Sequence, residues 1–285
     1  MLPSDTIART DSKRDTEKGL DVTIPPASAK SASGMQLKLL SNPTEAGRVS
    51  PLRFQVIGAD GAPVTDYDVV HERSLHMFAL RDGGKAAATA RFSDFQHLHP
   101  SHIGKGVWEI NDFAVPASGA TRIVADLTSR GEQQIAQATF DVAAGAAYAP
   151  RDRSGGFTAK VVHSMPMQNA VHAVVELRDA GGKPVTSVKP YLGAAGHWAL
   201  FNTGSTDAAP VGVAHAHPMG GLKDGKLEFH VVLPESGAYS GWLQFQPDGQ
   251  ELLTVPLTVG PGGGGHGPGH GGGGHGPHNG HVPAR

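Results

Sequence analysis

Apolar and polar residues alternate along several short segments of this chain, with the period of two that is typical of half-buried β-strands. In PLRFQVI (51–57), apolar side chains alternate with arginine and glutamine before an Asp-Gly turn signal at 60–61. KLEFHVV (226–232) shows the same alternation, and 109–119 contains a further strand followed by a Pro/Gly-marked turn. Because no segment longer than about two helical turns has a period of 3.6, we expect an all-β chain.

Sequence landmarks recur at nearly constant spacing, which indicates a tandem duplication. His-x-His-Pro occurs twice, with His99 and His217 separated by 217 − 99 = 118 residues, and FAVPASG and VVLPESG share this offset. Upstream, His76 and His197 are separated by 197 − 76 = 121 residues. A deletion of three residues in the second copy (121 − 118 = 3) accounts for the difference.

The repeats and the composition of the segments around them predict the domain organisation. We expect two tandem antiparallel β-sandwiches, immunoglobulin-like or cupredoxin-like, because several short strands separated by turn signals are typical of that architecture. The predicted boundaries are a disordered arm at 1–34, repeat one at 35–143, a linker at 144–156, repeat two at 157–260 and a Gly/His-rich tail at 261–285.

Composition excludes several classes of function. The 285 residues carry a net charge of −2, which gives no signal for nucleic-acid binding. The absence of cysteine excludes disulfides, thiolate zinc sites, cysteine nucleophiles and blue-copper centres. No apolar run reaches the roughly 18 residues of a membrane span, and no signal peptide is visible at the N-terminus. The protein is therefore either cytoplasmic or has a leader outside this sequence.

Histidines at equivalent positions of the two repeats are the candidate metal ligands. Residues i and i+2 of a strand project from one face, so His97 and His99 can converge on one ion, and His76 can add a third imidazole. Neutral imidazole suits Zn²⁺ and Cu²⁺. The alternative is a structural or vestigial role for all of these residues. The candidate ligands are His76, His97 and His99 in repeat one and His197, His215 and His217 in repeat two.

The tail is a second candidate site of a different kind. Twelve of its 25 residues are glycine, so several imidazoles can wrap around one ion with modest affinity. The alternative is a spacer or an expression tag. Its histidines are His266, His270, His275, His278 and His281.

Other residues are weaker candidates. His163, Met165 and Met167 form a possible soft Cu(I) set, although methionines more often fill cores. We expect four further histidines to be solvated, and two carboxylates to lie at the surface. These are His71, His102, His172 and His230, and Glu109 and Asp112.

Enzyme motifs are missing from the sequence. There is no G-x-S-x-G elbow and no Gly-rich phosphate loop between a strand and a helix. The cupin pattern needs a glutamate three or four residues after His-x-His, where this chain has Ile103 and Gly104 in one copy and Gly221 and Leu222 in the other. We therefore expect a protein that is not an enzyme.

The segments YLGAAGHWAL, VAHAHP and LPESGAYSGWLQFQPDGQ resemble a family of exported bacterial proteins with tandem β-sandwich domains. The resemblance covers about 45–260 and is weaker in repeat one, where VVHERSLHMFAL replaces PYLGAAGHWAL. It implies a periplasmic or secreted protein of heavy-metal, especially copper, handling, whose motif histidines are the six named above. Such a protein would buffer or deliver Cu²⁺ or Zn²⁺, with a metal ion and a protein that receives the metal as expected partners. The alternative is a non-enzymatic β-sandwich interaction module whose histidines are structural.

Overall fold

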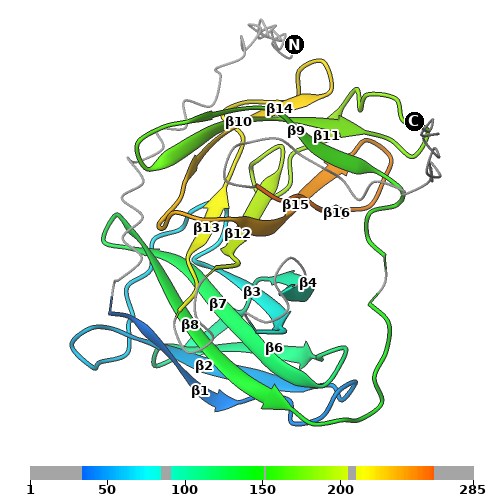
Figure 1. Cartoon of the computed structure of the whole chain (residues 1–285). Helices are drawn as coiled ribbons and strands as arrows, with labels where there is room; N and C mark the ends of the chain where they lie inside the picture. Colours follow the sequence, from blue (N-terminus) through cyan, green and yellow to red (C-terminus); the bar gives the residue numbers. More distant parts are fainter. Residues whose placement is uncertain (1–33, 85–90, 151, 205–209, 260–285) are drawn as a thin grey trace, which may run out of the picture.

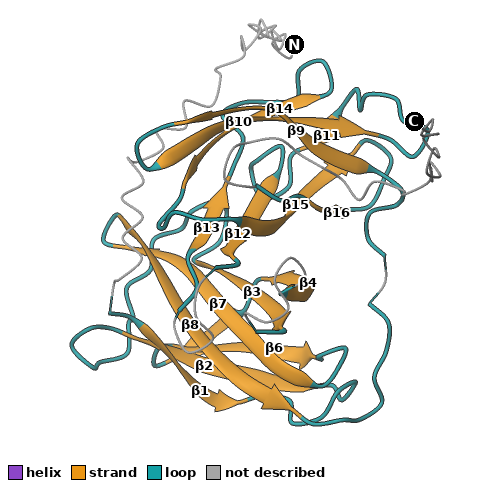
Figure 2. Ribbon diagram, viewed as in Figure 1, coloured by secondary structure: helices purple, strands orange, loops and turns teal. Residues whose placement is uncertain are grey.

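The computed structural model describes residues 34–84, 91–150, 152–204 and 210–259. All regular secondary structure in these ranges is β, as Figure 2 shows. The strands form two tandem β-sandwiches, β1–β8 and β9–β16, one above the other in Figure 1. The prediction of an all-β chain with two antiparallel sandwich repeats is confirmed.

Repeat one consists of two four-stranded sheets, with strand orders β1-β2-β6-β5 and β4-β3-β7-β8. Its named strands pair antiparallel throughout. The strands are β1 (Gln36–Ser41), β2 (Ser50–Ile57), β3 (Leu75–Asp82), β4 (Phe92–Leu98), β5 (Ser101–Gly104), β6 (Val107–Phe113), β7 (Gly119–Ser129) and β8 (Glu132–Val142).

Repeat two has the same strand order. Its sheet β9-β10-β14 corresponds to β1-β2-β6, and the path β13-β12-β15-β16 corresponds to β4-β3-β7-β8, with β11 also pairing with β15. The strands are β9 (Thr158–Pro166), β10 (Ala170–Arg178), β11 (Val188–Lys189), β12 (His197–Asn202), β13 (Val213–Ala216), β14 (Lys226–Val232), β15 (Tyr239–Pro247) and β16 (Leu253–Pro256). This correspondence confirms the internal repeat.

Each repeat encloses its own hydrophobic core between its two sheets. In β2 the alternation read from the sequence places Leu52, Phe54 and Val56 in the first core, with none of their surface exposed. In β12 and β14, Trp198 and Phe229 contact edge to face in the second core. Because each core is enclosed within one repeat, each repeat buries apolar surface independently of the other.

A third cluster lies between the repeats and buries the outer faces of β3 and β12. Met77 points into the core of repeat one, whereas Phe78, the next residue of β3, packs against Phe201 of β12 with ring centroids 5.9 Å apart. Phe95 of β4 and Trp242 of β15 extend this contact as a parallel stack at 4.7 Å. The two equivalent sheets therefore pack face to face, and both faces of β3 and β12 are buried.

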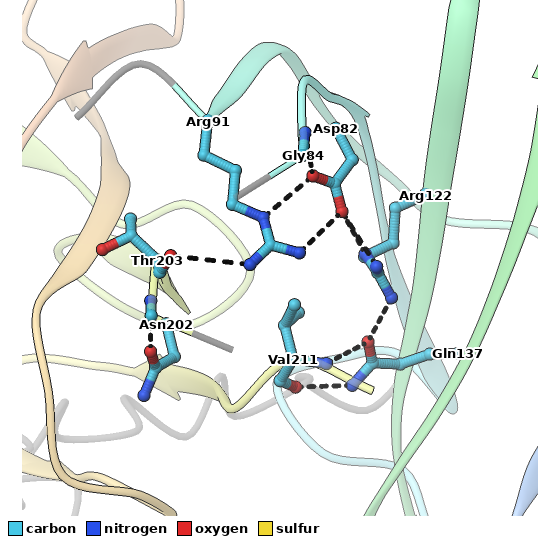
Figure 3. A network of polar contacts seen from close by, with 9 residues as sticks. Asp82, Gly84, Arg91, Arg122, Gln137, Asn202, Thr203 and Val211 are labelled. Atoms are coloured by element: carbon cyan, nitrogen blue, oxygen red, sulfur yellow. Dashed lines mark hydrogen bonds and ion pairs between the residues drawn. The ribbon is translucent and has the colours of Figure 1, made fainter. Parts of the chain in front are cut away.

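A polar network borders this interface (Figure 3). The Asp82 carboxylate accepts hydrogen bonds from Arg91 at 2.9 and 3.2 Å and from Arg122 at 2.8 and 3.0 Å, and all three side chains are buried. Gln137 of β8 binds the backbone of Val211 in repeat two through both its amide nitrogen and its amide oxygen. The two Gln137–Val211 bonds join the repeats and restrict the lateral position of one sheet on the other.

We expect Asp82→Asn to destabilise the protein by about 3–5 kcal/mol, because it removes the charge of a carboxylate that is hydrogen-bonded to two buried guanidinium groups. The matched control is Glu109→Gln, which removes the ion pair with half-exposed Arg53 at the surface and should cost less than about 1 kcal/mol. Urea unfolding of both variants measures the difference. Equal effects would show that the buried network does not contribute as described.

Candidate metal centre

The six histidines predicted as ligands lie together at the interface between the repeats. His76 comes from β3 and His97 from β4, and His99 follows β4 directly. The i, i+2 spacing brings the rings of His97 and His99 to a centroid distance of 4.7 Å. Pairing of β3 with β4 brings His76 beside them, with centroids 5.3 Å from His97 and 5.2 Å from His99.

Repeat two builds the equivalent group from β12 and β13. His197 begins β12, His215 lies in β13, and His217 follows that strand. The ring centroids of His215 and His217 are 4.5 Å apart, and those of His197 and His217 are 4.6 Å apart. In each trio, one nitrogen from each histidine lies within 4.8 Å of the other two.

The two trios face each other across the interface, which sequence reasoning did not anticipate. The ring of His76 is 5.1 Å from that of His215 and 6.2 Å from that of His197. The ring of His97 is 5.5 Å from that of His215. The distances between trios are thus similar to those within a trio.

Backbone carbonyls fix the outer nitrogen of one histidine in each trio. His76 donates from Nε2 to the carbonyl of Val70 at 3.4 Å, and His197 donates from Nε2 to the carbonyl of Tyr191 at 2.7 Å. A carbonyl can only accept, so both nitrogens carry the proton. In each neutral ring, Nδ1 is then unprotonated, and its lone pair points into the trio.

A second histidine of each trio is held by the opposite repeat. His215 binds the buried carboxylate of Asp126 through Nδ1 at 2.8 Å. His97 binds the side-chain oxygen of Gln244 through Nδ1 at 2.6 Å, while the Gln244 amide nitrogen donates to Thr254. Asp126 and Gln244 occupy equivalent positions, since 244 − 126 = 118. Because each of these bonds uses the proton on Nδ1, Nε2 of the neutral histidine is unprotonated, and its lone pair points inward.

These bonds place lone pairs against one another inside the centre. His76 Nδ1 and His97 Nε2 are 3.1 Å apart, although both protons are used on outer acceptors. In the second trio, the 2.9 Å contact is different, because His217 Nε2 can donate its proton to the lone pair of His197 Nδ1. Among the described residues, the buried Nε2 atoms of His99 and His215 have no hydrogen-bond partner.

Burial keeps the imidazoles neutral. It lowers the pKa of His197 to about 3 and that of His99 to about 4. The pKa values of His97 and His215 lie well below the usual value for the same reason, with the neighbouring histidines adding to the effect. Neutral imidazole is the form that ligates a metal ion.

Asp126 is an acidic residue in direct contact with the centre, and it was not identified from the sequence. Burial raises the pKa of its carboxyl, while His76 and a 2.8 Å hydrogen bond from Gln133 act in the opposite direction. Asp126 is also the cross-strand neighbour of His76, as Gln244 is of His197. The offset of 118 residues could have identified the pair, but only if the packing of the repeats had been known.

His71 was expected to be solvated, and this prediction is wrong. It is half-buried, and its ring packs against that of His217 in a tilted arrangement with centroids 3.6 Å apart. Burial lowers its pKa. His71 and Glu72 form a two-residue turn between Val70 and Arg73, with φ of 50° and 62°. Positive φ is costly for residues other than glycine, so this turn holds His71 over the second trio at the expense of backbone strain.

The other sequence candidates lie away from the centre. His163, Met165 and Met167 are exposed around the end of β9, so the idea that these methionines fill the core is wrong. His102 and His230 are exposed, as expected. His172 is partly buried, Glu109 pairs with Arg53, and Asp112 is exposed. The five tail histidines lie outside the described residues.

Residues 30–144 and 152–261 each match the family described as "Domain of unknown function (DUF8832)". The two matches cover most of the chain, so the protein belongs to this family and carries two copies of its domain. That description assigns no activity, and the copper association implied by the sequence resemblance stays a prediction. No curated protein matches the chain in sequence.

Several solved structures share a distant likeness with the chain. They include the Escherichia coli adhesin FdeC (18% identity, 81% of this chain and 64% of that chain, TM-score 0.24). Yersinia pseudotuberculosis InvD gives 14% identity over 81% of this chain and 59% of that one, with a TM-score of 0.24. MtrC of Shewanella baltica gives 10% identity over 81% and 70%, with a TM-score of 0.25. This chain therefore spans less than two thirds of the FdeC and InvD structures, and TM-scores this low support no functional argument.

Within the ranges that the structure describes, no helix is long and apolar enough to cross a membrane.

The metal-free protein should lose stability as pH falls from about 7 to about 4.5. The unfolded chain binds protons at its histidines near the ordinary pKa of about 6.5, whereas folded His99 and His197 bind them only near about 4 and about 3. Between these values the unfolded state holds more protons, so stability rises with pH in this window and is lost as pH decreases. We expect the Tm to decrease by at least about 5 °C over this pH range, which differential scanning calorimetry measures.

The variant His99→Gln should show a shallower dependence of Tm on pH, because one group that protonates on unfolding is removed. Exposed His230→Gln is the matched control and should follow the wild type. A Tm that stays constant down to pH 4.5 would contradict the burial of neutral imidazoles.

Proposed function

We propose that this protein is a non-catalytic metal-binding protein that takes up Cu²⁺ or Zn²⁺, one ion in each histidine trio, for buffering or delivery. The observation that supports this most directly is the pair of inward lone pairs on His76 Nδ1 and His97 Nε2. Both rings have already donated their protons outward, so these nitrogens repel each other at 3.1 Å unless a cation lies between them.

The spacing of the nitrogens fits a metal ion. Two nitrogens bound to one tetrahedral ion at about 2.0–2.1 Å are separated by about 3.3 Å. The facing lone-pair nitrogens of the first trio are 3.1 Å apart, close to this value. In the second trio, an ion would replace the 2.9 Å hydrogen bond between His217 and His197. The buried Nε2 atoms of His99 and His215, which have no partner among the described residues, supply a further donor to each trio. Three ligands leave a fourth position for water or for a group of a partner protein.

A second candidate is a β-sandwich interaction module in which the histidines serve only to join the repeats. The bonds from His215 to Asp126 and from His97 to Gln244 favour it, because both cross the interface. In that case the repeats would present their outer surfaces to a partner, and metal would have no effect on the protein.

Two parts of the proposal rest on the sequence alone. Residence in the periplasm or outside the cell, and transfer of metal to a partner protein, come from the resemblance to exported proteins with the same motifs. The tail histidines would add a weaker site, because a glycine-rich segment loses much conformational entropy when it wraps around an ion.

Single substitutions within a trio should weaken Cu²⁺ or Zn²⁺ binding by at least about ten-fold, because losses of outer partners alone typically cost 10–100-fold. The variants are His97→Gln and His99→Gln in repeat one and His215→Gln and His217→Gln in repeat two. Exposed His102→Gln and His230→Gln are matched controls and should bind as the wild type does.

Isothermal titration calorimetry of untagged protein, with metal analysis after purification without a metal resin, measures the effect. Wild-type binding that is unchanged by all four trio substitutions would support the interaction module and refute the metal centre.

Deletion of 261–285 should remove a class of weaker sites and leave the tighter sites and the Tm of the metal-free protein almost unchanged. The same titration, run on the full chain and on the shortened chain, tests this. Loss of all metal binding on deletion, with the fold retained, would assign binding to the tail instead of the trios.

A further inference from the structure

We propose that the two trios form a single dinuclear metal centre shared by both repeats, in which Asp126 makes the His197–His215–His217 site the tighter of the two. This inference rests on the proposed function, because it requires the trios to bind metal. It adds that the two sites are neighbours, that each depends on the opposite repeat, and that they are not equivalent.

The neighbour relation follows from ring positions. His76 lies 5.1 Å from His215, a histidine of the other trio, and 5.3 Å from His97, a histidine of its own trio. His97 lies 5.5 Å from His215 and 5.9 Å from His197. Two metal ions bound by rings that interleave in this way would lie in the same buried space between the repeats.

Dependence on the opposite repeat follows from the outer hydrogen bonds. Asp126 of β7 in repeat one orients His215, and Gln244 of β15 in repeat two orients His97. A partner on the outer nitrogen fixes the tautomer and the ring direction of a metal-binding histidine. Neither site is therefore complete within its own repeat, and metal in either site favours the docked arrangement of the sandwiches.

The inequivalence follows from the difference between these two partners. Asp126 is a carboxylate with one oxygen on His215 and the other on Gln133, whereas Gln244 is a neutral amide. A carboxylate raises the basicity of the imidazole that it binds, and so strengthens the bond from that imidazole to a metal ion. The second trio should therefore bind its ion more tightly.

A second difference between the repeats concerns the same trio. The turn of repeat one carries His71 and Glu72. The equivalent turn of repeat two lies 192 − 71 = 121 residues later in the sequence and carries Leu192 and Gly193. Of these two turns, only that of repeat one contributes an imidazole, whose ring packs against His217 with centroids 3.6 Å apart. This contact restricts the orientation of a ligand of the second trio. On the other side, Tyr191 of repeat two lies farther from the first-trio ligand His99, with ring centroids 6.3 Å apart.

The test uses Asp126→Asn, which keeps an oxygen that can accept from His215 but removes the charge. The full chain is titrated with Cu²⁺ in two backgrounds: His99→Gln, which impairs the first trio, and His217→Gln, which impairs the second. Asp126→Asn should weaken binding about 10-fold or more in the first background and by much less in the second. The exchange variant Gln244→Glu should strengthen binding in the His217→Gln background. Equal effects of Asp126→Asn in both backgrounds, or none in either, would overturn the inequivalence.

Electron paramagnetic resonance tests the dinuclear arrangement. Wild-type protein with two equivalents of Cu²⁺ should show spin coupling, seen as a loss or broadening of the mononuclear signal. The His217→Gln variant with one equivalent should show an isolated mononuclear signal. Two tightly bound ions with unperturbed mononuclear spectra would refute the shared centre while leaving the proposed function intact. If neither trio binds metal, the proposed function itself fails.

Discussion

The face-to-face packing of two equivalent sheets is the constraint on which the rest of this structure depends. It buries both faces of β3 and β12, so that alternate residues of each strand serve different cores. It also brings histidines from two sandwiches into one enclosure from which water is largely removed. The low pKa values of these imidazoles and the cross-repeat bonds to Asp126 and Gln244 are consequences of that packing.

Local patterns in the sequence were sufficient to predict the architecture of each repeat. The alternation in β2 and β14 identified half-buried strands, and the offsets of 118 and 121 residues identified the duplication. The grouping of His97 with His99, and of His215 with His217, follows from the two-residue period of an extended chain. These features depend on residues close in sequence or on repeated motifs, which a single sequence displays.

The relation between the two trios could not be predicted, because it depends on how one complete sandwich docks on another. His71 shows the same limit: its position over His217 depends on contact between repeats, and a lone histidine near a turn is usually solvated. One signal was available. HMFAL in β3 and HWALF in β12 are almost continuously apolar, which is typical of strands covered on both faces. That pattern indicates a buried outer face and, in a duplicated chain, points to the other copy as its cover.

The equivalence of the contacts on the two sides has an evolutionary consequence. His215 reaches from repeat two to position 126, and His97 reaches from repeat one to the matching position 244. Contacts related in this reciprocal way define an isologous interface, of the kind that joins two identical subunits about a two-fold axis. A single-repeat ancestor that paired with itself would have assembled the same six histidines from two separate chains, with the same residue at both outer positions. In one polypeptide the two positions are encoded separately, so one can be an aspartate and the other a glutamine, as they are here.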